Sequence, residues 1–350
     1  MRILVHECVS GGSLAGRPVP TSLAREGAAM RDALVTDLAA LRRHLVVTTV
    51  DPRFPFGTAP AGVEIVTLTP GNGSLLDGLL ASVDAAWLVA PETDGGLEEL
   101  AVRAERHGVA LLGPSVAAIR RASDKARLPE LLTRLGIAHP ETRVVGSDAE
   151  TRRAATALRF PVVLKPARGA GSAGVSLVRS PRELPAAVVA ARRVAGAERL
   201  LVQRYVPGVA ASVSLLTDGQ RAIALTVNGQ SLASPAFVYR GGVTPLDHPL
   251  AARAAAVAQR ACKAIPGLKG YVGVDAVLAE DETVVIEVNP RLTTAYLGLR
   301  VATDENVAGL ALAACAGRLP GALRLRRQVR FTGAGRILRT RRLLGSGPRS

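Results

Sequence analysis

Cysteine is scarce in this sequence. Cys8, Cys262 and Cys315 are odd in number and far apart, and they follow none of the usual spacings of a zinc site. Such cysteine usage is typical of proteins in a reducing compartment. We therefore expect a cytoplasmic protein without structural zinc and without a disulfide framework.

Long apolar runs are missing as well. No stretch approaches the roughly 18 uncharged apolar residues that a membrane helix needs, and residues 1–7 meet a charge too early for a secretory signal. Apolar residues nevertheless make up 48% of the chain, enough for a real hydrophobic core. We expect a globular protein with no membrane partner.

Aromatic residues amount to only 3%, too few to supply base-stacking platforms. The net charge of +15 is compatible with nucleic-acid binding. However, only four of the 44 basic residues are lysines, so the charge looks like an arginine bias of the whole chain. Binding to nucleic acid is therefore disfavoured, and the most basic stretch, residues 323–350, is expected to be a solvated tail. A contact of that tail with RNA, lipid or a partner remains the alternative.

The four lysines are informative because they are rare. Where arginine fills most basic positions, a lysine indicates a site that needs a compact ammonium rather than a planar fork. Lys125 and Lys165 stand within the motifs described below.

Strand and helix patterns alternate through residues 1–113, which predicts a parallel-sheet α/β unit with five strands. Ligands of such sheets bind at the carboxyl ends of the strands. Two loops at that edge, residues 7–12 and 91–96, are candidates for binding, although either could be an ordinary turn.

A glycine-rich loop follows the apolar strand predicted for residues 160–166. Gly169, Gly171 and Gly174 form a G-x-G-x-x-G pattern, but residues 175–178 are strand-like, whereas a dinucleotide site needs a helix there. The loop therefore joins two strands, as a flap over phosphate groups would, with a plain hairpin as the alternative. Upstream, Ser123 or Asp124 is expected to cap a helix that runs to residue 135.

Two later strands end in polar residues. Asp275 ends one of them, and Glu287 and Asn289, which lie on one face of the next strand because they are two apart, end the other. Two carboxylates and an amide oxygen suit Mg²⁺, which is commonly completed by substrate phosphates. Arg291 just beyond suits a phosphate oxygen. A solvated strand end is the alternative.

Taken in order, these parts resemble the ATP-grasp ligase superfamily over about residues 114–318. The resemblance implies ATP and Mg²⁺, or Mn²⁺, as cofactors, Lys165 and Arg291 as catalytic residues, and Asp275, Glu287 and Asn289 as metal ligands. The expected ATP contacts are Lys125, Lys165, Gly169, Gly171, Ser172, Gly174, Gln203, Arg204, Tyr205 and Val206. The sequence departs from the family at Gln203, where many relatives carry an acid, and at residues 209–211, which lack the acid that usually holds ribose.

The same resemblance predicts an α/β fold that becomes α+β toward the C-terminus. We expect a Rossmann-like domain at residues 1–113, a small lid domain with the glycine flap at 114–206, a metal-binding domain at 207–322, and the basic tail at 323–350.

Within the superfamily, residues 7–12, 25–27 and above all 287–300 resemble the tyramine–glutamate ligases of methanofuran and methylofuran synthesis. That resemblance implies a ligase joining the γ-carboxylate of glutamate to a tyramine- or tyrosine-like amine, with a homodimer as a further expectation. Alternatives are a ligase for another acid and amine, including carbamoyl-phosphate-synthase-like chemistry, and a regulatory ATP-binding protein. The candidate substrate contacts are Ser10, Gly11, Tyr239, Arg240, Thr293, Thr294 and Tyr296.

Overall fold

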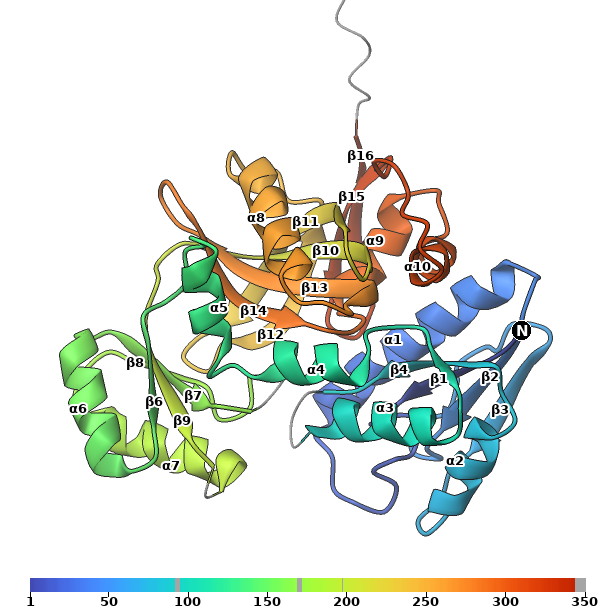
Figure 1. Cartoon of the computed structure of the whole chain (residues 1–350), viewed down its shortest axis with the longest axis horizontal. Coiled ribbons are helices and arrows are strands. Elements are labelled where there is room, and N and C mark those ends of the chain that lie inside the picture. The colour runs from blue at the N-terminus through green and yellow to red at the C-terminus, as the bar shows by residue number, and fades with distance from the viewer. Residues whose placement is uncertain (92–94, 169–171, 197, 344–350) are drawn as a thin grey trace, which may run out of the picture.

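The structure is a computed structural model that describes residues 1–350 except 92–94, 169–171, 197 and 344–350. Its strands form three separate sheets, which occupy different corners of the molecule (Figure 1). No helix in the described part of the chain is both long enough and apolar enough to cross a membrane.

The first sheet is the predicted parallel α/β unit, with strand order β3-β2-β1-β4-β5. Helix α1 packs on one face through Met30, Leu34 and Leu38, and helices α2 and α3 pack with the apolar residues of the other face. Both faces are therefore covered, as parallel sheets require. The elements are β1 (Arg2–Glu7), α1 (Thr21–Ala40), β2 (Leu45–Val50), β3 (Val63–Thr67), α2 (Gly73–Leu80), β4 (Ala85–Val89), α3 (Gly96–Arg106) and β5 (Ala110–Leu111).

His6 of β1 is fully buried, and its two ring nitrogens lie 2.7 Å from Thr49 Oγ1 and Ser13 Oγ. Burial, with help from Arg103 and Arg31, lowers its pKa from 6.5 to about 4. Between these values the unfolded chain binds a proton that folded His6 does not, so stability falls as the pH drops from 6.5 to 4. The expected loss is about 3 kcal/mol, since one pKa unit is worth about 1.36 kcal/mol.

Urea unfolding at pH 7 and pH 4.5 would check this expectation, with His6→Gln as the comparator. Glutamine can bond to both hydroxyls but does not titrate, so the variant should lose less stability on acidification than the natural chain. Equal losses in the two proteins would contradict the assignment.

The second sheet, with strand order β6-β9-β7-β8, forms the lid. Helices α6 and α7 pack on it through a core of its own that includes Ala155, Val188 and Ala191. The glycine-rich loop joins two antiparallel strands, β7 and β8, as predicted, although Gly169 and Gly171 lie outside the described residues. The elements are β6 (Thr142–Val145), α6 (Asp148–Leu158), β7 (Val162–Pro166), β8 (Ser176–Val178), α7 (Leu184–Ala195) and β9 (Leu200–Arg204).

Two short helices precede the lid, α4 (Val116–Ser123) and α5 (Leu128–Arg134). The predicted helix that runs to residue 135 is present as α5, but its start and its cap were wrong. It begins at Leu128, while Ser123 ends α4, which Ser115 caps, and the chain turns at Asp124 between the two helices. Both helices pack into the core of the large sheet, and the lid sheet begins only at β6. The predicted boundary at residue 114 therefore assigns these helices to the lid, whereas their packing joins them to the large domain.

The third sheet is antiparallel, with order β14-β13-β10-β11-β12-β15-β16. Helix α8 packs on one face, and helices α9 and α10 pack on the other, where they share a core with α1. The elements are β10 (Val209–Asp218), β11 (Ala222–Ala233), β12 (Val238–Thr244), α8 (Ala251–Lys263), β13 (Lys269–Leu278), β14 (Thr283–Asn289), α9 (Ala295–Ala302), α10 (Val307–Cys315), β15 (Arg327–Thr332) and β16 (Ile337–Arg342).

One region of this sheet corrects a sequence-based expectation. Residues 327–342 are not a solvated tail, because β15 pairs with β12 and buries Val329 and Phe331.

Helix α1 is joined to α9 by polar contacts as well as by the shared core. Tyr296 Oη donates a hydrogen bond to Asp37, and the Arg300 guanidinium forms an ion pair with the same carboxylate at 2.5 Å. At the other end of the joint, the Thr294 hydroxyl donates to Glu26. These contacts fix the N-terminal domain against the large sheet.

Candidate active site

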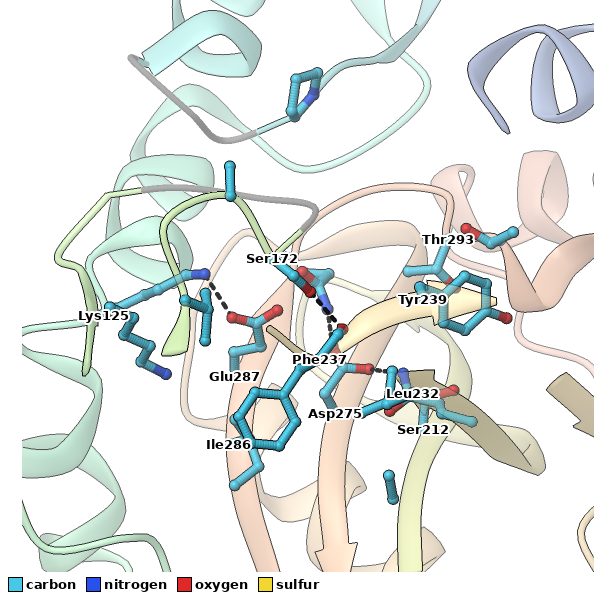
Figure 2. A pocket seen from close by; sticks show the side chains of 18 of the residues that line it. Lys125, Ser172, Ser212, Leu232, Phe237, Tyr239, Asp275, Ile286, Glu287 and Thr293 are labelled. Atoms are coloured by element: carbon cyan, nitrogen blue, oxygen red, sulfur yellow. Dashed lines mark hydrogen bonds and ion pairs between the residues drawn. The ribbon is translucent and has the colours of Figure 1, made fainter. Parts of the chain in front are cut away.

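A cavity of about 330 Å³ lies where the three sheets meet. The lid contributes β7 and β9, the large sheet contributes the ends of β13 and β14, and the N-terminal domain contributes the end of β1 together with one side of α1. Residues from parts of the chain that are far apart in sequence therefore share one space. Figure 2 shows its lining from close by.

The acidic residues that the sequence singles out meet at one wall. Strands β13 and β14 are antiparallel neighbours, and their register places Asp275 opposite Glu287 and Gly273 opposite Asn289. Asn289 Nδ2 donates to Asp275 Oδ2 at 3.1 Å, and Gln230 Nε2 donates to Asp275 Oδ1 at 2.9 Å. The prediction that the two strands are neighbours is confirmed, but Asp275 does not end its strand, because β13 continues to Leu278 and pairs with β14 in the antiparallel direction.

The two carboxylates of this wall have opposite electrostatic environments. Burial and the adjacent Glu287 raise the pKa of Asp275. Burial alone would raise the pKa of Glu287 too, but Lys125 and Lys165 outweigh that effect and lower it. A divalent cation between the two groups would remove the mutual repulsion that perturbs Asp275.

The donor set fits Mg²⁺. It offers two carboxylates and one amide on adjacent strands, open to the cavity. The described residues contain no group of three or more histidine, cysteine, aspartate or glutamate side chains that could hold a metal by themselves. Mg²⁺ commonly uses one or two carboxylates and takes its other ligands from phosphates and water. The metal role of Asp275, Glu287 and Asn289 stays a prediction that this chemistry supports.

Lys125 and Lys165 approach the acidic wall from two directions. Lys125, in the turn after α4, forms an ion pair with Glu287 at an Nζ–Oε2 distance of 2.6 Å (Figure 2). Lys165, on β7, is only 6% exposed, and burial together with the nearby charge of Lys125 lowers its pKa to about 8. Arg291, just past the end of β14, also lines the cavity. Three cationic side chains therefore border the two carboxylates.

The described part of the glycine flap closes over the cavity. Ser172 has a positive φ of 63°, and its hydroxyl donates to the Phe237 carbonyl oxygen at 2.7 Å. Gly174 has a φ of +69°, and a Cβ there would lie 3.1 Å from the Pro166 ring. A larger residue would therefore be strained at position 174.

Strand β9 is the last strand of the lid, and the chain passes from it to β10 of the large sheet. Gln203 is 5% exposed and donates its amide to Thr142 Oγ1 at 2.8 Å. The backbone N–H groups of Arg204 and Tyr205 donate to the carbonyls of Glu141 and Pro161. These two N–H groups hold the strand in place, while residues 203–206 all line the cavity.

Only some of the expected substrate contacts reach the cavity. Tyr239, Thr293 and Thr294 line it, and Tyr239 and Thr293 lie at the end away from Lys125 (Figure 2). The lining does not include Ser10, Gly11, Arg240 or Tyr296. Ser10 supports Glu7, Gly11 packs against the Glu7 backbone, Arg240 is exposed, and Tyr296 is buried at the joint with α1.

Three further polar residues of the lining, Glu7, Glu26 and Gln230, were not assigned a role from the sequence. Glu7 and Glu26 stand within residues 7–12 and 25–27, which carry the family resemblance, and Glu7 also ends a strand of the parallel sheet at the edge where ligands bind. Gln230 lies on β11 and belongs to no local pattern that indicates a site.

Comparisons with known proteins agree with this arrangement. A family model described as ATP-grasp domain matches residues 122–295, and one described as pre ATP-grasp 3 domain matches residues 44–119. A solved ATP-grasp superfamily protein from Archaeoglobus fulgidus is 25% identical, with a TM-score of 0.68 over 94% of this chain and 92% of that chain.

Two more distant structures share the fold. L-amino acid ligase from Bacillus licheniformis is 17% identical, with a TM-score of 0.70 over 94% of this chain and 79% of that chain. The biotin carboxylase domain of 2-oxoglutarate carboxylase from Hydrogenobacter thermophilus, solved with MgADP and bicarbonate, is 18% identical, with a TM-score of 0.72 over 94% and 73% of the two chains.

Proposed function

The chain belongs to the ATP-grasp superfamily of ATP-dependent ligases, and we propose that it joins a carboxylate to an amine through an acyl phosphate. The observation that carries the proposal is the wall at which Asp275 and Glu287 face each other beside Lys125, Lys165 and Arg291. Phosphoryl transfer depends on positioning and charge neutralisation more than on covalent chemistry by the protein, and this wall supplies both.

The nucleotide would lie between the lid and the large sheet. Lys125 and Lys165 would neutralise its phosphates as point charges, and Ser172 and Gly174 would cover them. Residues 203–206 would meet the adenine through the Gln203 side chain and the part of the backbone not engaged with Glu141 and Pro161. Asp275, Glu287 and Asn289 would hold Mg²⁺, or Mn²⁺ in its place, which supplies charge neutralisation at the transferred phosphoryl group.

The protein's own groups would then protect and orient the activated acid. Arg291 would stabilise the negative charge on the transferred phosphoryl group and on the acyl phosphate, since its planar fork matches phosphate oxygens. The closed flap would keep water from the acyl phosphate, which otherwise hydrolyses. The amine would attack the acyl carbon, forming the amide and releasing phosphate.

For the substrates, we propose glutamate, activated at its γ-carboxylate, and a tyramine- or tyrosine-like amine. The long resemblance over residues 287–300 supports this choice, and Tyr239, Thr293 and Thr294, which line the cavity, would contact such substrates. Tyr296 belongs to the same resemblance but packs against Asp37, so it does not help to select the amine.

The test is phosphate release with ATP and Mg²⁺ across a grid of amino acids against amines. The grid includes glutamate with tyramine and with tyrosine, and one arm contains bicarbonate with ammonia. We expect release that requires both an acid and an amine. Release with bicarbonate and ammonia alone would favour carbamoyl-phosphate-type chemistry. No release anywhere, with ATP still bound, would contradict the ligase and favour a regulatory nucleotide-binding protein.

A further inference from the structure

The end of the cavity next to α1 carries charges of a different sign from the end at which Lys125 and Lys165 would bind phosphates. Two carboxylates line it, Glu7 from the end of β1 and Glu26 from α1. The apolar surfaces beside them come from Leu23, Met30 and Tyr239. This end therefore combines negative charge with an apolar wall, whereas lysines border the other end.

Glu7 is only 2% exposed, and hydrogen bonds fix its carboxylate in position. Its carboxylate accepts hydrogen bonds from the Ser10 N–H at 2.5 Å, the Ser10 hydroxyl at 2.6 Å and the Val9 N–H at 3.1 Å. A Cβ at Gly27 would come within 2.5 Å of this carboxylate, so a glycine in the interior of α1 makes room for it. Glycine costs about 1 kcal/mol in a helix interior, and here it leaves the carboxylate at the cavity wall.

Neither carboxylate forms an ion pair within the described part of the chain, although the charges of Arg31 and Arg291 offset part of the burial cost of Glu7 and Glu26 respectively. Glu7 has only uncharged donors, and the nearby Arg31 uses its guanidinium on Asp32 and on the carbonyls of Ser10, Phe54 and Pro55. Glu26 accepts from Thr294, and among the described residues neither glutamate forms an ion pair. Burial raises the pKa of both groups. Buried carboxylates without a cation are costly, so a cation from the ligand would relieve the cost.

We propose that this end of the cavity is an ammonium subsite, in which Glu7 and Glu26 bind a protonated primary amino group of a substrate while its carbon chain packs on Leu23, Met30 and Tyr239. The inference rests on the proposed ligase function and narrows its substrates. A carboxylate would be bound near Arg291 and an ammonium at the glutamates. The ammonium belongs either to the amine co-substrate or to the α-amino group of the acid that is activated.

The experiment compares the natural enzyme with Glu26→Gln, Glu7→Gln and the control Glu105→Gln, whose side chain is exposed on α3. Glutamine at position 26 can still accept from Thr294, so this variant should fold even if Glu7→Gln does not. Binding to the ATP-loaded enzyme is measured by calorimetry for two matched pairs, tyramine with 4-ethylphenol and glutamate with glutarate. The second member of each pair lacks the amino group.

We expect the natural enzyme to prefer the amino member of at least one pair, and Glu26→Gln to weaken that member's binding about 10- to 100-fold. The KM for ATP should stay unchanged, as should all binding by Glu105→Gln. Loss of the tyramine preference assigns the subsite to the amine, and loss of the glutamate preference assigns it to the acid. Where the substrate grid identifies other substrates, they and their deaminated counterparts replace these pairs.

Two results would overturn the inference. One is that both glutamine variants keep ligase activity with an unchanged KM for every substrate that carries an amino group. The proposed ligase function would then stand, and the ammonium subsite would not. The other is an enzyme that binds ATP but shows no preference for an amino group. In that case tyramine, glutamate and the straight-chain alkylamines of two to six carbons would each bind no better than the same molecule without its amino group. If the grid shows no turnover while amines still bind through Glu26, the ligase proposal fails and the subsite stands.

Discussion

Replacing Glu287 by glutamine should lower ATP-dependent ADP release by at least about 100-fold while the protein stays folded. The substitution removes the charge of one proposed metal ligand and weakens the ion pair with Lys125. Changes to residues that merely support a metal ligand typically cost 10- to 100-fold in metal affinity or activity, so loss of the ligand itself should cost at least as much.

The matched control is Glu282→Gln, an exposed side chain in the turn between β13 and β14. It removes the same charge from the same hairpin without touching the cavity, and its activity should equal that of the natural enzyme. ADP release would be followed with the substrate pair that the grid identifies, and circular dichroism would confirm the fold. A folded Glu287→Gln variant that keeps its activity would remove the metal wall from the mechanism.

Replacing Arg31 by methionine should lower the free energy of unfolding by about 3–5 kcal/mol, the range typical when one partner of a buried polar network is removed. The Arg31 side chain is completely buried on α1. Its guanidinium donates to the carbonyls of Ser10, Phe54 and Pro55 and lies over the Phe56 ring. Methionine fills much of the volume but leaves these carbonyls without their donor, and a buried unsatisfied group costs about 1–3 kcal/mol.

Urea unfolding followed by circular dichroism would measure this loss. Arg25→Met is the control, because Arg25 is an exposed residue of the same helix, and it should change stability by less than about 0.5 kcal/mol. A loss below 1 kcal/mol in Arg31→Met would mean that the loops carrying Ser10 and residues 54–56 are held mainly by other contacts.

The parts of the molecule that could be predicted are those with a local signal. Alternating strands and helices predict the parallel sheet, because period and turn residues are properties of a few neighbouring positions. The spacing of Glu287 and Asn289 predicts their common face for the same reason. The strand after Gly174 likewise distinguishes the flap from a dinucleotide site.

The parts that could not be predicted depend on distant contacts. Glu26 bonds to Thr294, 268 positions away, and no local pattern anticipates such a pair. The sequence predicts a helix that overlaps α5, but no local pattern shows that α4 and α5 join the core of the large sheet. In β15, the alternation of the buried Val329 and Phe331 is a strand signal. Every residue of β16 is exposed and half of them are arginine, so its sequence contains no buried face from which the strand pairing could be predicted.

Helix α1 both lines the cavity and holds α9 against the N-terminal domain. Glu26, Gly27 and Met30 line the cavity, while Asp37 on the same helix holds Tyr296 and Arg300 of α9. A change in α1 that reshapes the cavity would also shift the joint between the domains. Over evolutionary time, new substrate preferences should therefore arise more readily at Tyr239, on β12, and at Thr293, between β14 and α9, while α1 varies little among relatives that accept different substrates.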